Sequence, residues 1–71
     1  MMAEFLGGPL DGPHELTRNL AEAPKLYLPV LPGGAFGPIE KTTGTWAANQ
    51  AYHLYHRAGN GEYKWVGRCS P

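Results

Sequence analysis

Alternation of apolar and polar positions is clearest in the last third of the chain, over residues 51–68. Two runs there, Tyr52–Tyr55 and Tyr63–Val66, are rich in aromatic and aliphatic strand formers. Between them, Gly59-Asn60 and Asn60-Gly61 are both two-residue turn signals, because primed turns need the positive φ that Gly and Asn tolerate. The pattern predicts a C-terminal β-hairpin that carries the core, and it leaves both turn registers open.

Both registers predict the same two faces of the hairpin, because they differ by two residues and strand side chains alternate with a period of two. We expect the more apolar face to be buried, and it carries Tyr52, Leu54, His56, Tyr63, Trp65 and Gly67. We expect the more charged face to be exposed, and it carries Ala51, His53, Tyr55, Arg57, Glu62, Lys64, Val66 and Arg68. A one-residue β-bulge would invalidate this assignment.

A further strand is predicted over Lys25–Leu31, where Leu26, Leu28 and Val30 share one face. Pro29 lacks a backbone N–H, so this strand is expected at an edge of the sheet or wherever that position faces solvent.

The N-terminal third predicts weaker elements separated by turn residues. Glu4–Leu6 is expected to form a short edge strand, and His14–Arg18 a second strand with Leu16 buried. Residues 19–23 can form one helical turn, for which Asn19 is an acceptable N-cap.

Residues 32–50 form a long connection without periodicity, which is unusual in a compact domain unless the loop is functional or disordered. It carries three large apolar side chains, Phe36, Ile39 and Trp46. One interpretation is that they fold back and close the open end of the sheet. The other is that they form a contact surface for a partner protein.

These elements predict a single all-β domain over residues 1–71. It is expected to be a small antiparallel sheet or partly open barrel of three to five strands, with long Gly/Pro-rich loops. A chain of this length buries only about 60% of the surface that it exposes when unfolded. Its one cysteine, Cys69, excludes an intrachain disulfide, and no paired cysteines suggest structural zinc. We therefore expect a subunit stabilised by neighbours in a homo- or hetero-oligomer.

Charge and hydropathy narrow the classes of partner. Lys and Arg together number six, as do Asp and Glu, so the formal net charge is zero and non-specific nucleic-acid binding is not expected. No apolar run has membrane-spanning length, and the first residues lack the basic region of a signal peptide. We expect the protein in the cytosol of the cell that makes it, or in a particle assembled there.

No constellation of residues predicts catalysis, a metal site or a cofactor. His53 and His56 have an odd spacing, which on a strand places them on opposite faces. Cys69 is close to the C-terminus, a poor scaffold for a nucleophile, and Ser70 is the only serine. The carboxylates show no paired spacing for acid–base chemistry. We expect a protein without enzymatic activity.

A nucleic-acid-binding β module is an alternative. Tyr55, Arg57, Lys64 and Arg68 lie on one predicted face of the hairpin, where an aromatic ring can stack on a base and cations can contact phosphates. Glu62 shares that face and would repel phosphate.

Two motifs stand near the ends of the chain, GGPxDG at the N-terminal end and a Tyr/Trp hairpin at the C-terminal end. Their residues are Gly7, Gly8, Asp11, Gly12, Tyr52, Tyr55, Tyr63, Trp65 and Gly67. In these residues the chain resembles a class of short proteins of actinobacteriophages and of bacterial genomes with phage-like genes, and residues 32–49 have no counterpart there. The resemblance carries over no catalytic residues. It implies a phage-type protein of the host cytoplasm or the virion.

The expected function is protein–protein contact, in a minor virion or head–tail structural component. An inhibitor of a host defence protein is an alternative that would also act through protein–protein contact and would differ only in its partner.

Overall fold

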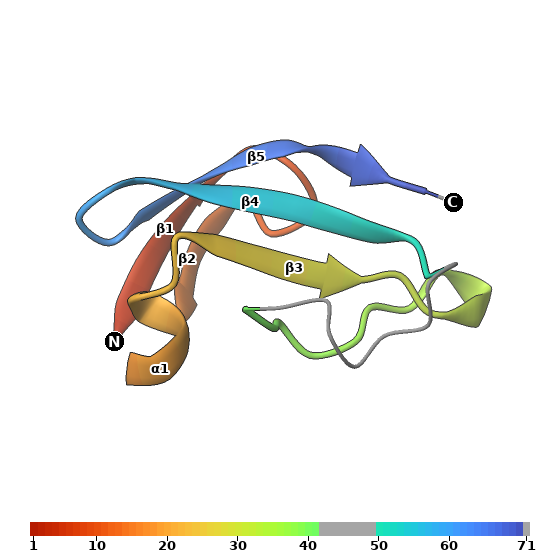
Figure 1. The fold of residues 1–71 in the computed structure, drawn as a ribbon, viewed down its shortest axis with the longest axis horizontal. Coiled ribbons are helices and arrows are strands. Elements are labelled where there is room, and N and C mark those ends of the chain that lie inside the picture. The colour runs from red at the N-terminus through yellow and green to blue at the C-terminus, as the bar shows by residue number, and fades with distance from the viewer. Residues whose placement is uncertain (42–49, 71) are drawn as a thin grey trace.

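The computed structural model describes residues 1–41 and 50–70, which form one five-stranded sheet curled into a half-barrel (Figure 1). The strands are β1 (Met2–Leu6), β2 (Gly12–Glu15), β3 (Lys25–Pro29), β4 (Tyr52–Gly59) and β5 (Glu62–Cys69). Their order in the sheet is β2-β1-β5-β4-β3. A short helix, α1 (Arg18–Ala21), follows β2, and a 3-10 turn, η1 (Pro32–Gly34), follows β3. The predicted all-β fold with a C-terminal hairpin is confirmed.

The sheet joins an N-terminal hairpin to a three-stranded meander. β1 pairs antiparallel with β2, and β3, β4 and β5 pair antiparallel in sequence order. The two halves meet where β1 runs parallel to β5, with Phe5 opposite Tyr63. The prediction that Glu4–Leu6 is an edge strand is therefore wrong, because β1 has a partner on each side.

The edge position predicted from Pro29 is confirmed, since β3 is the last strand of the sheet. The carbonyl of Pro29 accepts a hydrogen bond from the Gly37 N–H at 2.9 Å, on the side away from β4. The missing N–H of Pro29 lies on that same side, where no ladder bond is lost. Leu26 and Leu28 are buried as expected, although the strand ends at Pro29 rather than Leu31.

Two β-bulges set the faces of the C-terminal hairpin. The Asn60-Gly61 turn closes the pair Gly59–Glu62, but the next pair is Arg57–Tyr63, so Ala58 is an extra residue in β4. The pairs Tyr55–Trp65 and Leu54–Gly67 leave Val66 as an extra residue in β5. Between the bulges, Tyr55 and Arg57 therefore share the inner, concave face with Tyr63 and Trp65.

The predicted faces are consequently wrong for most of β4. Tyr55, expected to be exposed, is fully buried together with Tyr63. Tyr52, Leu54 and His56, expected in the core, lie on the outer face and are only half-buried. Trp65, also expected in the core, is 39% exposed. The cause is the Ala58 bulge, because one inserted residue reverses the pairing of the faces beyond it.

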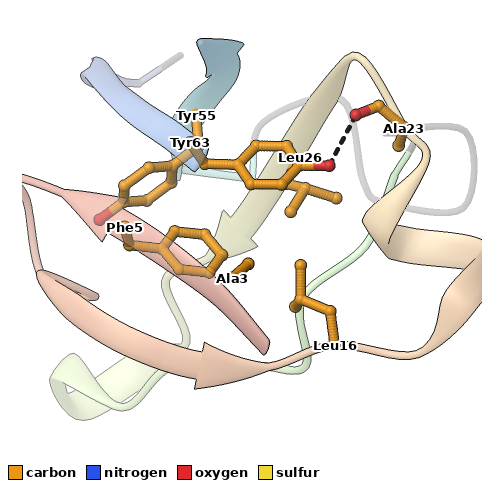
Figure 2. Close-up of a cluster of buried hydrophobic side chains, with 7 residues drawn as sticks. All are labelled: Ala3, Phe5, Leu16, Ala23, Leu26, Tyr55 and Tyr63. Atoms are coloured by element: carbon orange, nitrogen blue, oxygen red, sulfur yellow. Dashed lines mark hydrogen bonds between the residues drawn. The ribbon is translucent and has the colours of Figure 1, made fainter. Parts of the chain in front are cut away.

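The core fills the concave face where the two halves of the sheet meet (Figure 2). Its buried members are Ala3, Phe5, Leu16, Ala23, Leu26, Tyr55 and Tyr63. Phe5 stacks on Tyr63 with ring centroids 5.4 Å apart and meets Tyr55 edge-on at 5.1 Å. Burial of each large side chain contributes about 1.5–3 kcal/mol, so this aromatic group is the main hydrophobic stabilisation of a small sheet.

The segment between β2 and β3 differs in detail from the expectation. β2 is Gly12–Glu15 rather than His14–Arg18, although Leu16 is buried as expected. The helix begins one residue earlier than predicted, because Thr17 is its N-cap and accepts a hydrogen bond from the Leu20 N–H at 3.4 Å. Asn19, the predicted cap, instead accepts a hydrogen bond from Lys41 at 2.7 Å.

Candidate functional site

The GGPLDG motif forms a loop that is fastened to the core by one hydroxyl group. The Tyr55 hydroxyl accepts a hydrogen bond from the Leu10 N–H and donates one to the Gly7 carbonyl, both at 3.0 Å. The Asp11 carboxylate accepts a hydrogen bond from the Gly7 N–H at 2.7 Å. These bonds hold residues 7–11 against the concave face of the sheet at β4 and β5.

Glycine at position 8 lets this loop approach Trp65. Gly8 has φ +68°, a conformation that L side chains rarely adopt. A Cβ atom there would also lie 2.6 Å from the indole carbons of Trp65 and 2.5 Å from the Tyr55 hydroxyl oxygen. The bare backbone of Gly8 therefore forms one wall against which the indole of Trp65 is positioned.

Trp65 belongs to a cluster of three rings, Phe36, His53 and Trp65, which we call the aromatic end. The indole N–H of Trp65 donates a hydrogen bond to His53 Nδ1 at 3.2 Å. The His53 ring meets Phe36 edge-on, with centroids 5.9 Å apart. Trp65 is 39% exposed and Phe36 is 48% exposed. Two large aromatic side chains are thus presented to solvent on either side of a histidine that holds one of them in place.

The electrostatics of the aromatic end favour the neutral form of His53. Burial lowers the pKa of His53, and the neighbouring Arg68 guanidinium lowers this pKa further. Because Nδ1 accepts the indole hydrogen bond, the neutral ring carries its proton on Nε2. Arg68 lies opposite His53 in the β4–β5 ladder, is exposed, and forms no ion pair within the described part of the chain. The site is therefore an apolar surface with one cation beside it.

The three loop residues predicted as a protein contact have different outcomes. Phe36 is exposed and belongs to the aromatic end. Ile39 is partly buried and packs against the core, as the interpretation of a loop that closes the sheet expects. Trp46 lies outside the described residues.

The four residues predicted as a nucleic-acid surface do not share an exposed face. Tyr55 is fully buried, so its ring cannot stack on a base. Arg57 and Arg68 lie on the concave side, near opposite ends of β4 and β5. Lys64 is paired with His56 on the outer face. The premise of a shared face is wrong, and the Ala58 bulge is again the reason.

Sequence reasoning did not assign Trp65 and His53 to a surface site. Trp65 was placed in the core, and His53 was placed on the opposite face from it. No residue type marks the bulge at Ala58, which places the two rings on one face. The GGPxDG motif was recognised, but its contact with Trp65 becomes visible only in three dimensions.

The remaining polar chemistry of the molecule is sparse. Among residues 1–41 and 50–70, no three His, Cys, Asp or Glu side chains lie close enough to hold a metal ion. The same residues include no helix with the length and apolar character needed to cross a membrane. Cys69 is half-buried on the outer face beside Tyr52, and a hydrogen bond to its thiol raises the pKa of Tyr52.

Comparison with protein-family models, with curated proteins and with solved structures finds no match for this chain.

Proposed function

We propose that this protein is a non-enzymatic binding module that contacts another protein through the aromatic end. The observation that carries the proposal is the fixed exposure of Trp65 and Phe36 on either side of His53. Tryptophan side chains are enriched among the residues that dominate protein–protein affinity, because they bury a large area with few rotatable bonds. Arg68 supplies a cation beside the apolar surface, where it can pair with a carboxylate of the partner.

Preorganisation favours a binding role for this surface. The indole of Trp65 is held by the hydrogen bond to His53 and by the backbone of Gly8. A side chain already ordered in the free protein avoids a conformational cost on binding of about 0.5–1.5 kcal/mol. A partner therefore gains most of the hydrophobic free energy of covering the two rings.

The resemblance to phage-type proteins supports a more specific version of the proposal. A minor virion or head–tail component would use the aromatic end to contact a neighbouring subunit, of the same or another kind. An inhibitor of a host defence protein would use the same surface on a different partner. A mass spectrum of purified particles separates the two, because only a structural component is present there in a fixed proportion.

The contact itself is tested by cross-linking mass spectrometry on the tagged full-length chain in the cells or particles that contain it. We expect a captured partner to be lost with Phe36→Ala, a substitution at an exposed ring. Lys64→Ala, on the outer face of β5, is the matched control and should retain the partner. Equal capture by wild type and Phe36→Ala would contradict the proposal, as would binding only to single-stranded oligonucleotides.

A further inference from the structure

A cleft lies at the other end of the sheet from the aromatic end, beside the turn between β4 and β5. Figure 1 shows the position of this turn. The cleft has a volume of about 410 Å³ and lies between the start of β1, the end of α1 and residues 57–63. The residues that give it its chemical character are Met1, Met2, Ala3, Glu22, Arg57 and Tyr63. Its volume falls in the range of about 300–1,000 Å³ that is typical of small-molecule sites.

The apolar part of the cleft consists of two buried residues and two adaptable ones. Ala3 and Tyr63 belong to the buried core and lie at the base of the cleft. Met1 and Met2 line it as well and are largely exposed. Methionine is unbranched and polarizable, so it fits apolar ligands of differing shape. Covering these two side chains would remove apolar area from water that the protein alone leaves exposed.

The residues that line the cleft carry two charged side chains of opposite sign, besides the terminal ammonium group of Met1, which donates a hydrogen bond to the Leu16 carbonyl at 2.8 Å. Arg57 lies opposite Tyr63 in the ladder. Burial raises the pKa of Tyr63, and the positive charge of Arg57 opposes that rise. Glu22 comes from a different element, the end of α1. Both side chains are exposed, and within the described residues neither forms an ion pair, with the other or with any third group.

We infer that this cleft binds a small zwitterion with an apolar side chain, such as a free aliphatic amino acid. Arg57 presents a planar fork of donors that suits a carboxylate. Glu22 suits an ammonium group, and the two methionines with Ala3 suit the aliphatic part. A dicarboxylate is disfavoured by Glu22, and a simple cation by Arg57. This site is distinct from the aromatic end and does not depend on the function proposed for it.

The test uses the ¹⁵N-labelled full chain titrated with L-leucine, with N-acetyl-leucine and leucinamide as probes that lack one charge. We expect saturable chemical-shift changes at Ala3, Arg57 and Gly61 with leucine. Removal of either ligand charge should weaken binding about tenfold, the effect of one charge-assisted hydrogen bond. Arg57→Gln should weaken the binding of leucine about tenfold and leave the binding of leucinamide unchanged. Glu22→Gln should weaken the binding of leucine but not that of N-acetyl-leucine.

Arg68→Gln is the matched control, because it removes the same charge outside the cleft, and Phe36→Ala separates this site from the aromatic end. Both variants should bind leucine as wild type does. The inference is overturned if leucine gives no saturable shifts, if the shifts gather at the aromatic end, or if Arg57→Gln binds leucine normally. It is also overturned if Arg57→Gln and Glu22→Gln each lower stability while no probe binds, since the two charges would then pair with each other.

Discussion

Tyr55 and Tyr63 lie on either side of Phe5, and their hydroxyl groups point in opposite directions (Figure 2). Tyr55 binds the backbone of the loop between β1 and β2. Tyr63 reaches the carbonyl group of Ala23 at 2.8 Å, at the start of the connection to β3. Two neighbouring strands thus carry two buried phenols, each of which fastens a different surface segment to the same aromatic core.

Tyr55→Phe should destabilise the protein by about 1–3 kcal/mol, because it leaves the Leu10 N–H and the Gly7 carbonyl without their partner while the ring stays in place. Denaturant unfolding measures the loss. Hydrogen exchange should show faster opening at Leu10, with Ala23 little affected. A variant as stable as wild type would mean that water replaces the hydroxyl at no cost.

Tyr63→Phe should have the complementary effect. The hydroxyl has one proton to donate and lies near three carbonyl groups, those of Leu20, Ala21 and Ala23. Its loss should cost a similar ~1–3 kcal/mol and loosen the end of α1, with the β1–β2 loop unchanged. Each tyrosine variant is the control for the other, and identical exchange patterns in both would show that the two segments open as one unit.

Gly8→Ala should destabilise more than Gly33→Ala. Both positions have positive φ, +68° and +84°, so each alanine incurs a backbone cost of about 1–2 kcal/mol. A Cβ at Gly33 meets nothing within 4 Å, whereas one at Gly8 collides with Trp65 and Tyr55. Overpacking adds about 1–3 kcal/mol at Gly8 alone. Thermal or denaturant unfolding of the pair isolates this packing term, and equal losses would contradict the close approach of the loop to Trp65.

Acid should weaken the aromatic end through His53. The folded protein lowers the pKa of His53 from its ordinary value of 6.5, so the unfolded chain binds the proton more readily. The stability contributed by neutral His53 is therefore present above about pH 6.5 and declines as pH falls from there to the lowered folded value. Protonation also places a hydrogen on Nδ1, which can then no longer accept the Trp65 indole bond.

This acid step is measured by following the Trp65 indole N–H resonance and the unfolding free energy between neutral and mildly acidic pH. His53→Asn supplies a non-titrating acceptor at the same position and should remove the step. A step of unchanged size in this variant would contradict its assignment to His53.

Local sequence was sufficient for the features that depend on a few adjacent residues. The turn residues predict a hairpin closed at Gly59-Asn60 or at Asn60-Gly61, and the structure has the turn at Asn60-Gly61, where Gly61 has φ +75°. Pro29 predicts an edge strand, because its lack of a backbone N–H donor is a property of that residue alone. The all-β class followed from the strand-forming runs and the abundance of glycine and proline.

Only the tertiary structure determines which face of the sheet each side chain of the β4–β5 hairpin occupies. The bulge at Ala58 turns Tyr55 and His53 to the concave face, while Trp65 on the same face remains 39% exposed. The bulge disrupts strand pairing only locally, but it stabilises contacts with distant parts of the chain. Tyr55 packs against Phe5 of β1 and donates a hydrogen bond to the Gly7 carbonyl. That balance involves residues almost fifty positions apart, so no pattern within the hairpin reveals it. The aromatic end exists for the same physical reason, since the side chains that fill the core determine which rings remain outside it.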